Sequence, residues 1–201
     1  MCDYLDLINK VNIKKPPGIK TKKWSFYHKD TQKERMAAMM DFDYGDKVLE
    51  IGCCIGFLGV LICKYNEGIK NYTGIDLDKD YIKIANKLSK VNNLSKIKFM
   101  VANGCNINAI DDDNFNTIIM AEILEHLHCP MDMLLEARRV LCKNGNIIIT
   151  VPSKGALPPS KEPEHVQDFS VSDMKNLISK AKLKLIKHFK VNKWEFYLTK
   201  K

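Results

Sequence analysis

Short runs rich in apolar residues alternate with longer amphipathic patterns along most of this 201-residue chain. The runs are strand-like and end at glycine, proline, asparagine or acidic residues, and they lie at 48–51, 71–76, 97–101, 115–120 and 147–151. Helical patterns separate them, starting near residues 57, 79 and 130, and residues 143–146 predict a turn before the last run. Strands that alternate with helices form a mostly parallel sheet, because each crossover returns the chain to the same edge. We therefore expect an α/β fold.

Both ends of the chain carry other patterns. Residues 30–40 predict an amphipathic helix. Residues 183–186 and 194–198 predict two closing strands with a short connection between them. Residues 1–29 contain a Pro-Pro-Gly break and no sustained periodicity. We therefore divide the chain into an N-terminal arm or lid, residues 1–29, and a single domain, residues 30–201.

The stretch that follows the first predicted strand carries the clearest functional signal. Gly52 and Gly56 allow a sharp turn and a close approach to a ligand, since no Cβ intervenes. The helix after the turn directs free N–H groups at the same place, which favours an anionic group there. Asp76 ends the second strand 20 residues beyond Gly56, and an acid at this spacing reaches ribose hydroxyls in nucleotide-binding folds. The alternatives are an ordinary strand-to-helix turn and a helix cap, although Asp78 is better placed as the cap.

These residues resemble the first two motifs of the class I S-adenosylmethionine-dependent methyltransferases, small-molecule type. The first motif of that family is an acid followed by three glycines at alternate positions. Glu50, Gly52 and Gly56 match it, and Cys54 stands at the middle glycine. We expect the backbone of Cys54 still to follow the glycine-type turn, with its side chain packed away from the ligand. An NAD site is the rival, but its Gly-x-Gly-x-x-Gly pattern requires glycine where Cys54 stands.

The resemblance covers about residues 44–200. It implies a single-domain Rossmann-like methyltransferase fold, with a mostly parallel seven-stranded sheet that ends in an antiparallel strand pair. It also implies S-adenosylmethionine as cofactor. Asn103 stands near the acid with which the family usually binds the adenine amino group, and its carbonyl oxygen can serve instead; a turn residue before Gly104 is the alternative. The residues expected to bind the cofactor are Glu50, Gly52, Cys54, Gly56, Asp76, Leu77, Asn103, Gly104 and Ala121.

A second group of polar residues follows the fourth strand. Glu122, Glu125 and His126 share one face of a helix that we expect to begin near Ala121. His165 lies in the loop after the fifth strand, which opens on the same edge of the sheet. Histidine suits general-base work near neutral pH, so the catalytic candidates are His126, His165 and Glu122.

Two carboxylates and two imidazoles could also hold a divalent metal. Glu122, Glu125, His126 and His165 match the metal ligands of the small-RNA 3′-terminal 2′-O-methyltransferases, a weaker resemblance that implies Mg or Mn. Many small-molecule methyltransferases carry a similar Glu-x-x-Glu-His-Leu segment without metal. There the histidines line the substrate pocket.

The acceptor class follows from these two resemblances. We expect methyl transfer to an oxygen or nitrogen of a small molecule. Metal-assisted 2′-O-methylation of an RNA 3′ end and a cofactor-binding subunit without catalysis are the alternatives. An Asn/Asp-Pro-Pro-aromatic turn, which indicates N-methylation of DNA or protein glutamine, is replaced by Met120-Ala121-Glu122-Ile123.

Composition adds little to this picture. The net charge of +8 fits either an anionic or RNA partner or a surface solvated by lysine. Seven cysteines in irregular spacing predict reduced thiols and a cytoplasmic protein. No segment predicts a membrane span or a signal peptide, so we expect no membrane partner.

Trp24, Phe26 and Tyr27 predict a lid over the acceptor pocket, or simple docking on the sheet. The pattern does not indicate an oligomeric state.

Overall fold

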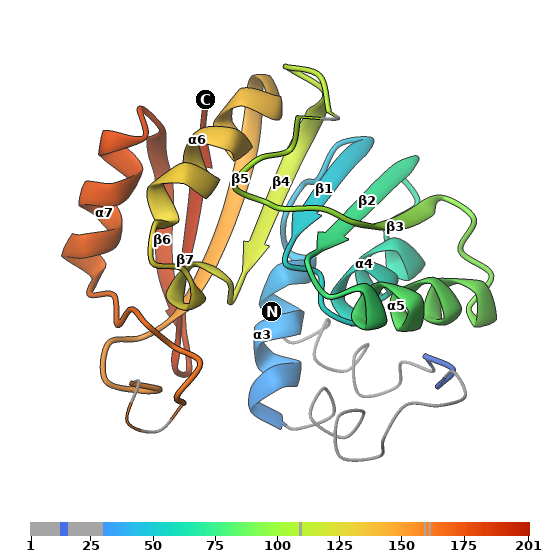
Figure 1. Ribbon diagram of the computed structural model, residues 1–201, viewed down its shortest axis with the longest axis horizontal. Coiled ribbons are helices and arrows are strands. Elements are labelled where there is room, and N and C mark those ends of the chain that lie inside the picture. Colours follow the sequence, from blue (N-terminus) through green and yellow to red (C-terminus); the bar gives the residue numbers. More distant parts are fainter. Residues whose placement is uncertain (1–12, 16–29, 109, 159, 161) are drawn as a thin grey trace.

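The computed structural model describes residues 13–15, 30–108, 110–158, 160 and 162–201. Within them a seven-stranded sheet has the order β3-β2-β1-β4-β5-β7-β6 (Figure 1). Strands β1 to β5 pair in parallel, and β7 lies antiparallel between β5 and β6. The strands are β1 Lys47–Ile51, β2 Asn71–Asp76, β3 Ile97–Val101, β4 Phe115–Ala121, β5 Leu141–Pro152, β6 Lys184–Val191 and β7 Trp194–Lys200. The predicted α/β fold, including its terminal antiparallel pair, is confirmed.

Helices cover both faces of the sheet (Figure 1). One apolar cluster joins the sheet to α3 Asp30–Met40, α4 Phe57–Tyr65 and α5 Lys79–Val91. A second cluster joins its other face to α6 Pro130–Val140 and α7 Val171–Lys180. Neighbouring strand residues such as Val48 and Leu49 belong to different clusters, because successive side chains of a strand point to opposite faces. Each strand is therefore held from both sides.

Local sequence signals fix several of the element boundaries. The carboxylate of Asp78 accepts from the backbone N–H groups of Asp80 and Tyr81, which caps α5 as the sequence suggested. Ser170 and Asp173 form a reciprocal capping box at the start of α7. These caps satisfy N–H groups that the first turn of a helix leaves unpaired.

The prediction that a helix begins near Ala121 is wrong. Strand β4 continues through Ala121, which pairs with Thr150 of β5, and the backbone N–H of Glu122 donates to the Thr150 carbonyl at 3.0 Å. Glu122 then adopts a left-handed φ of 55°, and only a short 3₁₀ helix, η1 Leu124–His126, follows. Pairing with the neighbouring strand therefore overrides the helical spacing.

The predicted start of the fifth strand is also wrong. Strand β5 begins at Leu141 rather than near 147, and the expected turn lies inside it as an irregularity. Asn144 has a φ of 65°, and the pairing register with β4 shifts between Phe115 and Thr117. The irregular segment keeps its strand character because β4 supplies hydrogen-bond partners on both sides of the shift.

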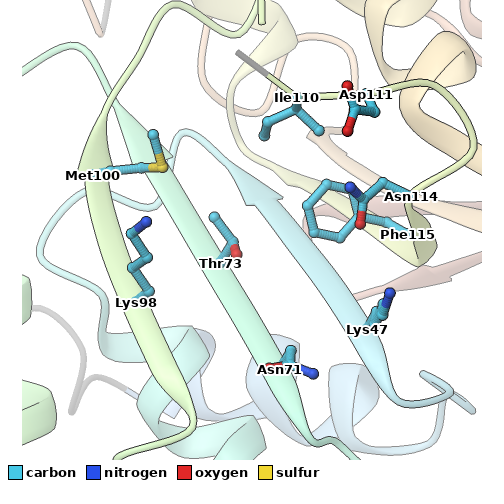
Figure 2. A pocket seen from close by; sticks show the side chains of 9 residues that line it. All are labelled: Lys47, Asn71, Thr73, Lys98, Met100, Ile110, Asp111, Asn114 and Phe115. Carbon is cyan, nitrogen blue, oxygen red and sulfur yellow. The ribbon is translucent and has the colours of Figure 1, made fainter.

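The connection from β3 to β4 contains no helix among its described residues. Arg139 of α6 holds it, donating to the carbonyls of Ile107 and Ile110 and to the carboxylate of Asp112. A hollow of about 410 Å³ lies beneath this connection, at the amino-terminal half of the strands (Figure 2). Its lining comprises Lys47, Asn71, Thr73, Lys98, Met100, Ile110, Asp111, Asn114 and Phe115. None of the predicted site residues belongs to it.

Only a small part of the N-terminal arm is described. Ile13 is buried in the first apolar cluster, and the side-chain amide of Asn92 pairs with both the N–H and the carbonyl of Lys14. The proposed lid residues Trp24, Phe26 and Tyr27 lie outside the described residues, so the lid stays a prediction. Within the described ranges, no helix combines the length and apolar character needed to cross a membrane.

Candidate active site

The turn after β1 has the tight geometry that its glycines predict. Gly52 and Gly56 have φ values of 78° and 74°, a left-handed region that residues with a Cβ rarely adopt. A Cβ on Gly56 would stand 2.5 Å from Cζ of Phe99, and one on Gly52 would stand 2.9 Å from Cδ1 of Ile123. Both the conformation and the packing therefore require glycine at these two positions.

Cys54 adopts the same left-handed backbone, with a φ of 49°. The glycine-type conformation predicted for Cys54 is confirmed. Its side chain packs against the apolar cluster of α3, α4 and α5. Its N–H donates to Oδ2 of Asp76 at 2.8 Å, while Oδ1 of Asp76 accepts from the N–H of Asp78 at 2.9 Å. Asp76 thus ties the turns after β1 and β2 together at the carboxyl edge of the sheet.

Glu50 is buried beneath this turn. The hydroxyl of Tyr72 donates to Oε2 of Glu50 at 2.8 Å. Burial raises the pKa of Glu50 from its usual 4.5 to about 7, although the Tyr72 hydrogen bond and the charge of Arg35 act in the opposite direction. The carboxyl group therefore changes charge close to neutral pH.

The edge next to Asp76 is open and partly apolar. The side chain of Leu77 is 69% exposed, and Val101, which pairs with Asp76 across β2 and β3, is 51% exposed. The side-chain oxygen of Asn103 accepts from the N–H of Cys105 at 3.0 Å, as the turn-residue alternative requires. A Cβ on Gly104 would meet Ile51, so the chain passes close to the end of β1 here.

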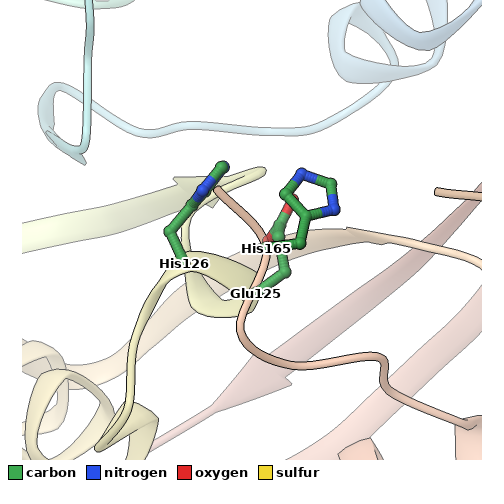
Figure 3. Close-up of side chains that lie close together, drawn as sticks. All are labelled: Glu125, His126 and His165. Atoms are coloured by element: carbon green, nitrogen blue, oxygen red, sulfur yellow. The ribbon is translucent and has the colours of Figure 1, made fainter. Parts of the chain in front are cut away.

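On the far side of this edge, Glu125, His126 and His165 converge (Figure 3). One ligand-type atom of each lies within 4.8 Å of the others. The two imidazole rings meet edge to face, with centroids 4.7 Å apart. Nδ1 of His126 lies 3.0 Å from the carbonyl of Glu164, and Nδ1 of His165 lies 2.7 Å from the carbonyl of Leu157. A carbonyl can only accept, so each Nδ1 carries a proton, and in the neutral form of each ring the lone pair lies on Nε2.

Glu125 is 1% exposed, and neither carboxylate oxygen has a hydrogen-bond partner in the described structure. Burial raises the pKa of Glu125 well above its usual value, and the nearby charge of Glu122 raises it further. A buried carboxyl group without a partner is rare in native proteins and indicates a place where a ligand or proton is expected.

Glu122 is not part of this cluster. Its Oε1 accepts from the hydroxyl of Thr150 at 2.9 Å, and its Oε2 accepts from Nε1 of Trp194 at 2.5 Å. Desolvation raises the pKa of Glu122, and the charge of Arg35 opposes that rise. The structure therefore brings together three of the four predicted metal ligands. The fourth, Glu122, is held against β5 and β7 by its hydrogen bonds with Thr150 and Trp194.

Arg35 is a functional candidate that the sequence reasoning missed. It is 6% exposed on α3, its Nε donates to Oε1 of Gln32 at 3.1 Å, and its guanidinium lies 5.8 Å from the centre of the Trp194 ring. The available signal was its spacing: Gln32, Arg35, Met36 and Met39 share one helix face, and two of these four inward positions are polar.

The cysteines agree with a reduced protein. Six cysteines fall within the described residues, and no disulfide joins any two of them. The cellular compartment stays a prediction.

Comparisons with known proteins agree with one another. The sequence profile of a family described as "Methyltransferase domain" matches residues 42–197. The ubiquinone biosynthesis O-methyltransferase of Pelagibacter ubique (strain HTCC1062) is 32% identical over 108 residues. That match covers 54% of this chain and 42% of the relative, so the chain matches less than half the length of that curated protein.

Solved structures share the fold at low sequence identity. A SAM-dependent methyltransferase from Aquifex aeolicus has a TM-score of 0.73 and 17% identity, with 90% of this chain and 98% of that chain covered. The [4+2]-cyclase SpnF has a TM-score of 0.75 and 13% identity, with 86% and 82% covered. At such identities the likeness establishes the fold alone, and a fold hosts more than one chemistry.

Proposed function

The chain belongs to the methyltransferase-domain family. From that premise we propose that it is a class I S-adenosylmethionine-dependent methyltransferase and that it methylates a hydroxyl oxygen of a small molecule. The observation that carries this proposal is the pair of imidazoles, His126 and His165, at the carboxyl edge of the sheet. A carbonyl holds Nδ1 of each ring, and Nε2 of each has no partner among the described residues. An oxygen acceptor needs a base, whereas a nitrogen acceptor needs less help. The relative from Pelagibacter ubique, named as an O-methyltransferase, agrees with this choice.

The residues at the first turn fit the cofactor. Each oxygen of Asp76 is used by one backbone N–H and keeps a second acceptor site, so the carboxylate can still accept from two ribose hydroxyls. The exposed Leu77 offers an apolar surface beside it. The sulfonium of bound S-adenosylmethionine supplies an activated methyl group. The residues proposed to surround it are Glu50, Gly52, Cys54, Gly56, Asp76, Leu77, Asn103, Gly104 and Ala121.

We assign the proton transfer to the histidine pair. Nε2 of His126 or His165 would take the hydroxyl proton as the acceptor oxygen receives the methyl group that bound S-adenosylmethionine would supply, with S-adenosylhomocysteine as the leaving group. The carbonyls of Glu164 and Leu157 fix the ring orientations, so the lone pairs are in place before the acceptor arrives. Glu125 lies beside both rings, and the positive charge of the imidazolium that results would favour the ionised form of this carboxyl group, whose pKa burial otherwise raises.

Variants of the histidines test this assignment. His126→Gln and His165→Gln should lower kcat by about a hundredfold to ten-thousandfold, the range for general-base catalysis. Their affinity for S-adenosylhomocysteine should stay within about twofold of wild type, because neither ring belongs to the cofactor turn. His128→Gln, an exposed histidine two residues from His126, is the matched control. Release of S-adenosylhomocysteine with catechol as acceptor measures the rate. Full activity in both variants would show that the acceptor pocket lies elsewhere.

A divalent metal at Glu125, His126 and His165 is a second candidate. The specific observation is that both Nδ1 atoms are anchored by carbonyls, which is how metal-binding histidines are oriented. Two imidazoles and one carboxylate suit Mn or Zn better than Mg. Activity lost on chelation and restored by Mn would support this candidate and the RNA 3′-end reaction. Activity that survives chelation assigns the histidines as bases. The relatives named above favour neither RNA methylation nor a cofactor-binding subunit without catalysis.

A further inference from the structure

Arg35 carries a buried N–H group that nothing in the described structure uses. Its Nη1 is shielded from solvent and has no hydrogen-bond partner, while its Nε is held by Gln32. An arginine stays charged under all ordinary conditions, so the unused donor cannot be relieved by losing a proton. Leaving a charged donor unpaired in a buried position is unfavourable, and such a group usually has a ligand or an ion as partner.

The carboxylates around Arg35 do not provide this partner. Glu50, Glu122 and Glu125 are close enough for the charge of Arg35 to lower the pKa of each. Glu50 instead accepts a hydrogen bond from Tyr72. Glu122 accepts hydrogen bonds from Thr150 and Trp194. The guanidinium is therefore surrounded by acidic groups while its Nη1 keeps no hydrogen-bond partner in the described structure.

The surroundings of Arg35 place it between the two halves of the site. Glu50 lies at the end of β1, beside the cofactor turn, and Glu125 belongs to the histidine cluster after β4. Trp194, under the guanidinium, begins β7 at the same edge of the sheet. A ligand group bound by Arg35 would thus lie near both the cofactor and the acceptor.

We propose that Arg35 receives a carboxylate of a bound ligand, supplied either by the amino-acid end of the cofactor or by the acceptor. The guanidinium fork matches a carboxylate in geometry and charge. The rigid contacts with Gln32 and Trp194 limit the rotamer freedom that binding would otherwise remove. The acceptor source rests on the proposed function, whereas the cofactor source requires only that the cofactor binds.

Paired ligands that differ by one carboxylate-bearing group test the cofactor source. S-adenosylhomocysteine contains the amino-acid end, and 5′-methylthioadenosine is the same nucleoside thioether without it. In calorimetry, Arg35→Gln should weaken S-adenosylhomocysteine binding by about tenfold to a hundredfold and leave 5′-methylthioadenosine within about twofold. Arg35→Lys should recover part of the loss, because it restores charge but not the fork. Arg138→Gln, an arginine on α6 that contacts the carbonyl of Lys182, is the matched control and should bind both ligands as wild type does.

A second pair of probes tests the acceptor source. 3,4-Dihydroxybenzoate and catechol carry the same two hydroxyls, and only the first has a carboxylate. If S-adenosylhomocysteine binding is unchanged in Arg35→Gln, KM for 3,4-dihydroxybenzoate should rise about tenfold or more relative to catechol. A selective loss in either pair supports the proposal and identifies the source.

Two results would overturn it. The first is wild-type binding of all four probes by Arg35→Gln. The second is an equal loss of affinity for both members of each pair in Arg35→Gln, together with a lower melting temperature that adding Glu125→Gln restores. Arg35 would then only neutralise buried carboxylates. A wild-type protein that binds S-adenosylhomocysteine but methylates neither acceptor counts against the proposed function alone and leaves the cofactor arm valid.

Discussion

Replacing Glu50 with glutamine should make the ligand-free protein more stable above neutral pH. Glu50 is buried, and burial holds its pKa at about 7, against 4.5 in an exposed chain. A group with a raised native pKa binds its proton more tightly in the folded state, so its contribution to stability is present at low pH and lost as pH rises towards 7. Glutamine cannot ionise, and its carbonyl oxygen can still accept from the Tyr72 hydroxyl.

The size of the effect follows from the shift. The difference between 4.5 and about 7 is about 2.5 units, and each unit corresponds to about 1.4 kcal/mol. The free energy of unfolding of wild type should therefore fall relative to Glu50→Gln by about 3 kcal/mol at pH 8, and by less than about 1 kcal/mol at pH 5. Tyr72 and Arg35, which lower the Glu50 pKa, are present in both proteins, so the comparison isolates the Glu50 proton.

Urea denaturation of both proteins between pH 5 and pH 8, without cofactor, measures this difference. Glu67→Gln, which changes an exposed glutamate in the loop after α4, is the control and should track wild type at every pH. A stability difference between wild type and Glu50→Gln that does not change with pH would refute the reasoning. It would mean that Glu50 ionises in the folded protein as easily as in the unfolded chain.

Three further changes test the cofactor turn. Asp76→Ala should weaken S-adenosylhomocysteine binding by about 1–3 kcal/mol in calorimetry, the range for lost charged hydrogen bonds, and unchanged affinity would count against Asp76 as the ribose ligand. Cys54→Gly should keep or improve that affinity and raise the melting temperature, since glycine adopts the φ of 49° without strain; a large loss of affinity would show that the thiol contacts the cofactor. Gly56→Ala should lower the free energy of unfolding by about 1–3 kcal/mol, because its Cβ would lie 2.5 Å from Cζ of Phe99; an unaltered urea midpoint would contradict this packing.

The sequence by itself determined the framework and the glycine turn after β1. The predicted bounds of β2 and β3 agree with the structure, and α5 begins after Asp78 as its capping pattern indicates. These features depend on residues a few positions apart, and apolar periodicity, caps and glycine turns are local signals. The turn at Gly52 and Gly56 was readable for the same reason.

Only the tertiary structure decided how the polar residues after β4 are arranged. Glu122 has the spacing of a helical neighbour of Glu125, yet pairing between β4 and β5 extends the strand and turns Glu122 towards Trp194. The meeting of His126 with His165 depends on a loop that returns from the end of β5. Arg35 reaches its neighbours from a helix that precedes them all in the chain. Such contacts join segments far apart in sequence, and a local pattern cannot encode which segments the sheet brings to one edge.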